Sequence, residues 1–368
     1  MRILHINCNY IGTTLHQLMV ENLDELGIEN EVFVPTYDRS IAVIKPNDNV
    51  YVSECFNKWD RIAFDYKQKK ILNAIEKQYD VRSFDLIHAY TLFTDGNVAK
   101  CLSEKYNVPY VVAVRNTDIY DFFKKMIHLR SRGVKIMLSA KKIFFLSQPY
   151  LNTIIKKYVK GKFQDEIKLK SKLIPNGIDE FWFENIAKSK RRRLNENVKL
   201  IYAGVIDKNK NITTTQAAMD ILKLKGYKVS LTVVGRVVDH LELERVKKNI
   251  DTKILGAVGK KELIDIYRAN DIFVMPSIHE TFGLVYAEAM SQGLPVVYTK
   301  GQGFDEQFKN GVVGFAVDCM SASEIANAII DLLSEYEKYS KNAIYCCQKF
   351  DWKKIATEYA NIYEEIIR

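Results

Sequence analysis

Long apolar runs and regularly spaced cysteines are missing from this chain. No apolar run approaches the roughly 20 residues that a helix needs to cross a bilayer. The first residues, MRILHINC, run directly into an apolar strand and do not resemble a signal peptide. The six cysteines show no CxxC spacing, and the adjacent Cys346 and Cys347 are poorly placed to pair with each other. We therefore expect reduced thiols and a cytoplasmic protein.

Several ligand-binding motifs are missing as well. Without an Asp-x-Asp motif or a histidine cluster, we expect no metal and no bound cofactor. Zinc spacings, helix-turn-helix patterns and RNP-like aromatic strands are lacking, which argues against a nucleic-acid partner. No G-x-G-x-x-G follows the first strand or the strand expected at Lys199–Ala203, so a dinucleotide-dependent oxidoreductase has no support.

What the chain does have is an excess of positive charge, +9 at pH 7. Two basic stretches stand out, Lys160–Lys172 and Lys188–Arg193. Each is either a solvated surface segment or a point of attraction for anionic lipid headgroups, where each cation near the surface adds about 1 kcal/mol. A basic surface also suits phosphorylated substrates. Peripheral contact with an anionic membrane is therefore one hypothesis.

Expected strands and helices alternate along the chain, which is typical of α/β proteins with parallel sheets. The turn Pro175-Asn176-Gly177 and the polar stretch Asp179–Asn197 separate two such series. The last helix, Trp352–Ile367, is amphipathic. Other helices are expected at Thr14–Leu26, Asp60–Gln78 and Gly96–Lys105. Strands are expected near Arg2–Ile6, Glu31–Val34, Leu86–Ala89, Tyr110–Val114, Ile143–Leu146, Lys172–Ile174, Lys199–Ala203, Ser230–Val234, Lys253–Leu255, Ile272–Met275, Pro295–Tyr298 and Gly314–Val317.

The most informative segment is residues 272–297, IFVMPSIHETFGLVYAEAMSQGLPVV. Its apolar strand leads into a polar turn with Glu280, and a helix is expected from about Gly283 to Gln292. Open α/β sheets bind ligands at the carboxyl ends of their strands. The first N–H groups of a helix form an anion site, and here they belong to Phe282, Gly283 and Leu284.

Two glutamates bracket the start of this helix. Glu288 lies five residues past Gly283, on the order of 7–8 Å along the helix axis. This is roughly the distance from a diphosphate to the ribose of the same nucleotide, so Glu288 is suited to accept hydrogen bonds from ribose hydroxyls. Glu280 precedes the helix, on the side where a transferred group would lie. The alternative is a surface helix with two ordinary glutamates.

This segment resembles the signature of the retaining glycosyltransferases of family 4, which have the GT-B fold. The resemblance covers essentially the whole chain and is strongest from 172 to 315. It implies two Rossmann-like domains whose parallel sheets face each other across a cleft. Residues 1–178 would bind the acceptor, 179–350 would bind the nucleotide-sugar, and the helix 351–368 would cross back to the first domain. The matching residues are Pro276, Ser277, Glu280, Phe282, Gly283, Leu284, Glu288, Ala289, Gly293, Pro295 and Val296.

The resemblance assigns further residues to the donor. Lys210 matches the family's phosphate lysine at the expected spacing from Gly204, whereas Val205 stands where the family usually has arginine. Gly235 ends a neighbouring strand, and the base is expected near Val258. The glycines of Gly301-Gln302-Gly303 would permit close contact with donor hydroxyls.

The acceptor side departs from the family pattern. Asp118 matches it, but Arg115 replaces a histidine. Arginine stays protonated and is no base, so Arg115 would either brace a phosphate or form a structural pair with Asp118. Gly12 lies where the family has a short glycine-rich loop, and His88 is either a ligand-facing residue or a core histidine.

We therefore predict a retaining, metal-independent hexosyl- or N-acetylhexosaminyltransferase at the inner face of the cell membrane. Its donor would be a nucleotide-diphosphate sugar, with UDP favoured over GDP. Its acceptor would be a glycan or a polyprenyl-diphosphate-linked glycan in surface polysaccharide or glycoconjugate biosynthesis. Glu280 and Lys210 would act on the donor, with Asp118 and Arg115 opposite them. The alternative, which Val205 and Arg115 motivate, is a non-catalytic GT-B subunit that binds glycan or a partner protein.

Overall fold

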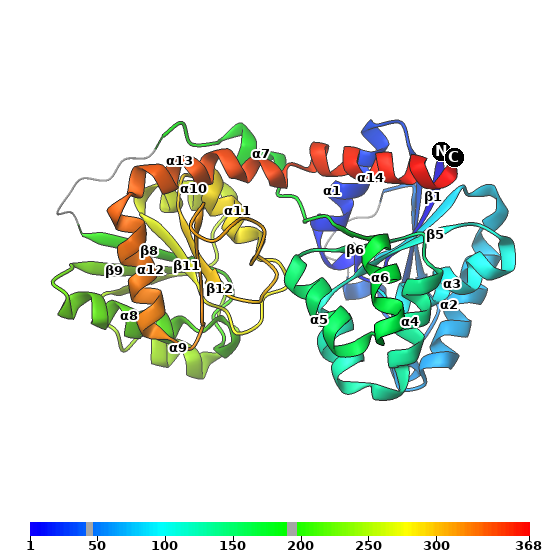
Figure 1. The fold of residues 1–368 in the computed structure, drawn as a ribbon, viewed down its shortest axis with the longest axis horizontal. Helices are drawn as coiled ribbons and strands as arrows, with labels where there is room; N and C mark the ends of the chain where they lie inside the picture. The colour runs from blue at the N-terminus through cyan, green and yellow to red at the C-terminus, as the bar shows by residue number, and fades with distance from the viewer. Residues whose placement is uncertain (42–46, 190–196) are drawn as a thin grey trace. The chain divides into compact units, whose positions relative to one another are not determined.

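The computed structural model describes residues 1–41, 47–189 and 197–368, and these form two compact units. Unit 1 comprises Met1–Gly177 and Trp352–Arg368, and unit 2 comprises Ile178–Asp351. Each unit contains one parallel sheet with helices packed against it (Figure 1). The predicted α/β class with two parallel sheets is therefore confirmed.

The sheet of unit 1 has seven strands in the order β3-β2-β1-β4-β5-β6-β7. Its central strands are buried on both faces, which explains continuous apolar stretches such as YVVAV. In that strand Val112 packs into the core on one face of the sheet and Val111 into the core on the other. The strands are β1 (Arg2–Ile6), β2 (Glu29–Thr36), β3 (Val50–Glu54), β4 (Leu86–Ala89), β5 (Tyr110–Val114), β6 (Lys142–Phe145) and β7 (Ser171–Leu173).

Helices cover both faces of this sheet. Five helices, α2 to α6, contribute to the core on one face, and α1 and α14 contribute to the core on the other. The apolar stripe of α14, including Ile355, Tyr359 and Tyr363, is thereby buried in unit 1. The helices are α1 (Thr14–Glu25), α2 (Phe64–Gln78), α3 (Thr94–Tyr106), α4 (Arg130–Ser139), α5 (Gln148–Tyr158), α6 (Gly161–Lys170) and α14 (Trp352–Ile367).

The sheet of unit 2 has six strands in the order β10-β9-β8-β11-β12-β13. From β8 the chain adds strands toward one edge of the sheet, through β9 to β10, and from β11 it adds them toward the other edge, through β12 to β13. Such a topological switch point favours ligand binding at the carboxyl ends of the two central strands, β8 and β11. The strands are β8 (Val198–Ala203), β9 (Val229–Val234), β10 (Thr252–Leu255), β11 (Ile272–Met275), β12 (Val296–Thr299) and β13 (Gly314–Val317). The helices are α7 (Glu180–Glu184), α8 (Ile212–Leu224), α9 (His240–Val246), α10 (Lys260–Ala269), α11 (Leu284–Ser291), α12 (Ala322–Ser334) and α13 (Tyr336–Cys346).

Two expectations about the elements need correction. The helix expected from Asp60 begins at Phe64, because Asn57 and Asp60 form a capping box around the separate 3-10 turn η3 (Lys58–Arg61). The strand β3 was not expected; it pairs with β2 at the sheet edge and is mostly half-exposed, which weakens its apolar signal.

Candidate active site

The two loops with the predicted donor residues meet at the switch point of unit 2. The strands β8 and β11 pair directly with each other. The loop after β8 contains the 3-10 turn η7 (Lys208–Lys210), and the loop after β11 leads into α11. Parallel strands end at the same edge of a sheet, so Lys210 and Glu280 come together although 70 residues separate them.

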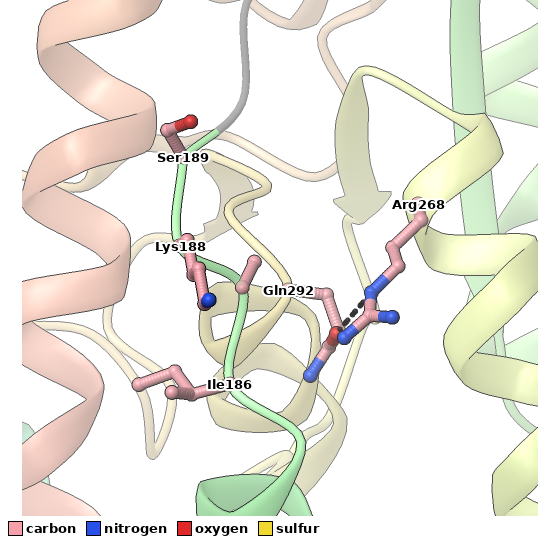
Figure 2. Close-up of a pocket in the computed structure, with 6 residues that line it drawn as sticks. Ile186, Lys188, Ser189, Arg268 and Gln292 are labelled. Carbon is pink, nitrogen blue, oxygen red and sulfur yellow. Dashed lines mark hydrogen bonds between the residues drawn. The ribbon is translucent and has the colours of Figure 1, made fainter.

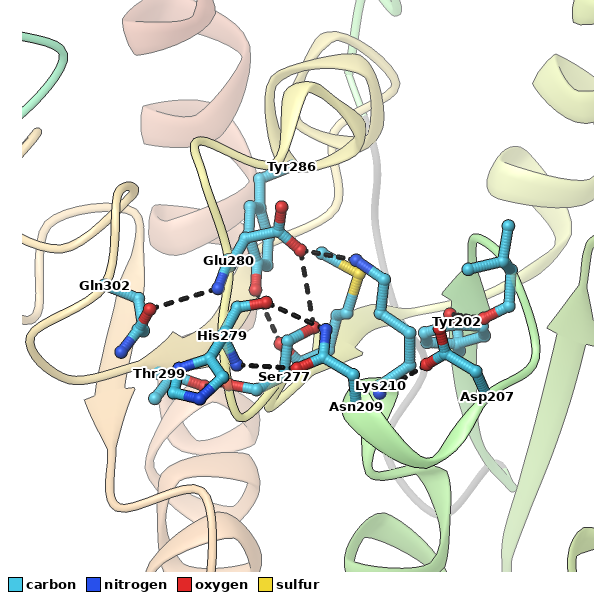
Figure 3. A network of polar contacts seen from close by, with 12 residues as sticks. Tyr202, Asp207, Asn209, Lys210, Ser277, His279, Glu280, Tyr286, Thr299 and Gln302 are labelled. Carbon is cyan, nitrogen blue, oxygen red and sulfur yellow. Dashed lines mark hydrogen bonds and ion pairs between the residues drawn. The ribbon is translucent and has the colours of Figure 1, made fainter. Parts of the chain in front are cut away.

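An ion pair joins these loops (Figure 3). The Nζ atom of Lys210 lies 2.6 Å from Oε2 of Glu280, and the two side chains are only 16% and 12% exposed. The Ser277 hydroxyl also donates to this carboxylate oxygen, at 3.4 Å. The lysine that was predicted to contact a phosphate therefore has Glu280 as its counter-ion in this structure.

Asn209 holds the backbones of the two loops together. Its Nδ2 donates to the carbonyl of His279 at 2.9 Å, and its Oδ1 accepts from the His279 N–H at 3.0 Å. The Asn209 carbonyl accepts from the Ile278 N–H at 2.8 Å. On the β8 side, Asp207 caps η7 by accepting from the Lys210 N–H at 3.0 Å. These bonds fix the two backbones from which the ion pair extends.

The segment Gly301-Gln302-Gly303 packs against Glu280. The Glu280 N–H donates to Oε1 of Gln302 at 3.0 Å, and the Gly303 N–H donates to the Glu280 carbonyl at 3.1 Å. A Cβ atom at Gly303 would lie 1.8 Å from the Thr281 carbonyl oxygen, so the close backbone approach requires glycine. This segment therefore supports the loop that carries Glu280.

The start of α11 offers main-chain donors. Its N-cap, Gly283, has a left-handed φ of +74°, and a Cβ there would lie 2.4 Å from the Tyr286 ring. The N-cap residue provides no side-chain cap, so the N–H groups from Leu284 onward can bind an anion. The Phe282 ring is buried among other aromatic rings, so this residue offers a ligand only its main chain.

Glu288 is a half-buried carboxyl group on α11. Burial raises its pKa to about 7; Lys260 acts to lower the pKa, and Asp179 acts to raise it. Asp179 and Lys260 are themselves paired at 2.5 Å. Within the part of the chain that the structure describes, the Glu288 carboxylate accepts no hydrogen bond. Such a group is suited to accept hydrogen bonds from a ligand hydroxyl.

Two glycines pack back to back beside this site. Gly204 has a φ of +155° and Gly235 a φ of +148°, and a Cβ on Gly235 would lie 1.8 Å from the Gly204 carbonyl oxygen. The Tyr202 hydroxyl donates to the carbonyl of Val205 at 2.6 Å, which holds that residue's backbone. Val258 is half-buried after β10. The structure brings Gly204 and Gly235 together.

In unit 1, Asp118 is wholly buried and bound by main-chain donors. It accepts from the N–H groups of Leu92 at 3.0 Å, Phe93 at 3.2 Å and Arg115 at 2.8 Å. Burial raises the pKa of its carboxyl group to about 6, and these three bonds act in the opposite direction. The carboxylate therefore joins the loops that follow β4 and β5.

The other predicted residues of unit 1 have different surroundings. Arg115 donates from Nε to the Tyr90 carbonyl at 3.1 Å, and it meets Asp118 through its main chain. Gly12 ends the 3-10 turn η1 (Tyr10–Gly12), where a Cβ would meet no atom within 4 Å. His88 is a core residue, since it is fully buried with Nδ1 2.6 Å from the Tyr363 hydroxyl.

A cavity of about 430 Å³ lies elsewhere in unit 2, against the segment after α7 and the ends of α10 and α11 (Figure 2). Two of its lining residues are joined by a hydrogen bond, because Nε of Arg268 donates to Gln292 at 2.9 Å. Glu280 and Lys210 do not line it. The converging charges and main-chain donors lie instead at the loops that carry the Lys210–Glu280 ion pair.

The two basic stretches differ in how much of them is described. Of Lys188–Arg193, residues 190–193 lie outside the described residues. In α6, Lys168 pairs with Asp165 at 3.2 Å and Lys170 with Glu166 at 2.7 Å, so part of this charge is neutralised locally. Among the described residues, none of the helices combines the length and apolarity of a membrane span.

The role of Asn209 could not be predicted from the sequence. Its only local signal was its position beside Lys210 in a loop at a strand end, because its partners lie 70 residues away. The Asp179–Lys260 pair near Glu288 could not be predicted either, because its members are 81 residues apart.

Comparison with known proteins points to one class of enzyme. Residues 183–345 match the family model described as "Glycosyl transferases group 1". An uncharacterized glycosyltransferase of Methanocaldococcus jannaschii is 24% identical over 360 residues, covering 96% of this chain and 95% of that protein.

Two solved structures share the fold. Sucrose-phosphate synthase from Thermosynechococcus elongatus superposes with a TM-score of 0.74 at 19% identity, covering 99% of this chain and 98% of the other. HepE from Anabaena, solved in complex with UDP, has a TM-score of 0.72 at 19% identity and covers 99% and 100% of the two chains. The family-model match and the relative that covers nearly the whole chain support a glycosyltransferase, and the two solved structures share its fold.

Proposed function

We propose that this chain is a family 4 enzyme that transfers a hexosyl or N-acetylhexosaminyl group from a UDP-sugar with retention of configuration and without a metal ion. The acceptor is a glycan or polyprenyl-diphosphate-linked glycan of surface polysaccharide or glycoconjugate biosynthesis, met in the cytoplasm at the inner face of the membrane. The observation that carries the proposal is the Lys210–Glu280 ion pair at the switch point of unit 2.

The donor diphosphate is bound at the start of α11. The N–H groups from Gly283 and Leu284 provide hydrogen bonds, and the helix dipole favours negative charge at this end. Lys210 supplies the cation, and Glu288 accepts hydrogen bonds from the ribose. UDP is favoured because the HepE structure, which shares the fold, contains it.

During transfer, charge develops on both sides of the breaking sugar–phosphate bond. Lys210 and the helix start stabilise the leaving diphosphate, and Glu280 positions the sugar and stabilises its positive charge. The leaving phosphate accepts the proton of the acceptor hydroxyl on the same face of the sugar, which retains the configuration. Lys210 has to exchange its carboxylate partner for phosphate, which frees Glu280 to face the sugar.

In unit 1, the proposed roles divide between Arg115 and Asp118. Asp118 positions the loop after β5 through its three main-chain bonds. Arg115 uses Nε to hold the Tyr90 carbonyl, and its terminal nitrogens are suited to contact a phosphate of the acceptor or donor. Gly12 lies in the loop after β1 at the same edge of the sheet.

Nucleotide binding and turnover test the proposal separately. Melting curves with UDP, GDP, ADP, dTDP and CMP should show the largest stabilisation with UDP, about 2.7 kcal/mol at 100 times its dissociation constant. The shift should be lost in Glu288→Ala and should persist in EDTA. Product anomers identified by NMR would establish retention; an inverted product would contradict that part.

The non-catalytic subunit is the other candidate, and Val205 favours it. A cation is missing at this position, and its carbonyl is occupied by the Tyr202 hydroxyl. UDP binding without sugar transfer to any acceptor would support the subunit. Transfer that is lost in Glu280→Ala while UDP affinity is retained would support the enzyme.

A further inference from the structure

Five large apolar side chains are exposed on two neighbouring segments of unit 1. Trp59 and Ile62, at η3 and just after it, are 77% and 81% exposed, and Tyr66 follows on the first turns of α2. Met126 and Ile127, beside the 3-10 turn η6 (Ile127–Leu129), are also exposed, Ile127 by 66%. We call these five residues the apolar surface of unit 1. Trp and Tyr are the residues enriched at membrane–water interfaces.

The two segments are packed together. The Phe64 ring, at the start of α2, lies 6.2 Å from the Phe122 ring, one turn before Met126. Arg132, at the start of α4, pairs with Asp65 and lies over the Phe64 ring. The apolar surface is therefore built from adjoining loops and not from scattered exposed residues.

Positive charge is concentrated on the same segments. Residues 57–70 contain five Lys and Arg against two Asp, and residues 121–135 contain five against one, a net charge of +7 where the whole chain carries +9. Lys58, Lys69 and Lys124 are exposed, and within the described chain they form no ion pair. Apolar side chains surrounded by cations are complementary to an anionic lipid surface.

The position of this surface in the fold agrees with that partner. The segment with Trp59 follows β3, and the segment with Met126 follows β5. Both therefore leave the carboxyl edge of the sheet, which is also the edge that carries Gly12, Arg115 and Asp118. A lipid surface bound here would meet the edge of unit 1 that the proposed function assigns to the acceptor.

We infer that the apolar surface of unit 1 and the lysines around it dock the protein on an anionic bilayer. Trp59, Ile62 and Ile127 insert at the level of the headgroups, and Lys58, Lys69 and Lys124 contact the lipid phosphates. The inference rests on the proposed function in one respect: docking would give the enzyme access to a lipid-linked acceptor. None of these residues belongs to the basic stretch Lys160–Lys172.

Tryptophan fluorescence tests the inference directly. The chain has three tryptophans, and Trp182 and Trp352 are 1% and 5% exposed, so a change on binding reports Trp59. With vesicles of phosphatidylglycerol and phosphatidylcholine in equal parts, and without nucleotide, we expect a blue shift of the emission and co-sedimentation of the full-length protein. Pure phosphatidylcholine should produce neither.

Variants separate the apolar and electrostatic contributions. Lys58→Ala combined with Lys69→Ala should weaken the affinity for vesicles about 30-fold, because each cation near the lipid surface contributes about 1 kcal/mol. Trp59→Ala combined with Ile62→Ala should weaken it at least tenfold. The matched controls are Leu241→Ala with Ile250→Ala and Lys225→Ala with Lys228→Ala. These residues of unit 2 are also exposed, and their replacement should leave binding unchanged.

Three results would overturn the inference. The first is that the protein does not bind anionic vesicles. The second is that the Trp59→Ala/Ile62→Ala variant binds them as tightly as the native protein. The third is that the native protein forms a concentration-dependent dimer and this variant does not, which would assign the surface to a second copy of the chain. UDP stabilisation is measured on the same samples. Its loss would count against the donor site alone, because vesicle binding is measured without nucleotide.

Discussion

In unit 2, the carboxylate of Glu280 faces the ammonium group of Lys210 across two loops; in unit 1, the carboxylate of Asp118 faces three main-chain N–H groups. Both lie at the carboxyl edge of a parallel sheet. A side-chain partner can be exchanged for a ligand while the backbone stays in place. Main-chain partners cannot be replaced without unpairing buried N–H groups. We therefore expect Asp118 to act as a positioning residue and Glu280 to act on the substrate.

The largest effect should come from breaking the ion pair of unit 2. Lys210→Ala removes the cation beside the leaving diphosphate, so we expect turnover to fall about 100- to 1000-fold. UDP affinity should fall as well, in contrast to Glu280→Ala. Because both side chains are largely buried, removing the lysine takes the counter-ion from the Glu280 carboxylate, so the melting temperature should fall as well. The control is Lys208→Ala, because Lys208 is an exposed lysine on the same turn. An equal loss of turnover in this variant would show that only the overall positive charge of the loop matters.

Asp118→Asn should have the opposite profile. The amide would direct N–H donors at main-chain donors, which we expect to lower the free energy of unfolding by about 2–4 kcal/mol in urea denaturation. UDP affinity should stay within twofold. Asp121→Asn, which breaks the more exposed pair with Lys125, should cost under about 1 kcal/mol. A stable Asp118→Asn protein that binds UDP but cannot transfer would instead place this carboxyl group at the reacting atoms.

Glu288 should couple pH to both stability and binding. Its pKa is raised from 4.5 to about 7 in the folded state. Between these pH values the folded protein keeps the proton that the unfolded chain has lost, so the free energy of unfolding decreases as pH rises from about 4.5 to 7. Glu288→Gln should therefore stabilise the nucleotide-free protein at pH 8 by about 1–3 kcal/mol.

The binding effect of the same change has the opposite sign. The ionised carboxylate is the better acceptor for ribose hydroxyls, so UDP affinity should rise from pH 6 to 8 in the native protein. This rise should vanish in Glu288→Gln, as calorimetric titration would show. A variant that keeps the same pH profile would exclude Glu288 from the nucleotide site.

The smallest effect should come from the backbone bridge between the loops. Asn209→Ala removes two hydrogen bonds to His279, which should cost about 1–2 kcal/mol of local stability. We expect a roughly tenfold loss of turnover at nearly constant UDP affinity. Asn209→Asp, which keeps one acceptor, should recover part of it. Wild-type turnover in Asn209→Ala would show that the ion pair aligns without this bridge.

Much of the local structure followed from the sequence. The apolar strand before Glu280 and the short helix to Ser291 both appear near the predicted positions, because their signals lie within one βαβ unit. No bounds were predicted for the helices α4 to α10, α12 and α13. The π-helical turn η5 (Asp118–Phe123), which follows β5, was not predicted either, because its residues do not keep the ordinary helical period.

The sequence by itself determined the fold class, the strand-turn-helix at 272–297 and the residue types available for binding a diphosphate. Only the tertiary structure decided that Lys210 faces Glu280, that Asp118 anchors main chain, and that the exposed side chains beside η3 and η6 form one surface. The physical reason is range. Periodicity and capping act over a few residues, whereas these contacts depend on which strands become neighbours in the sheet.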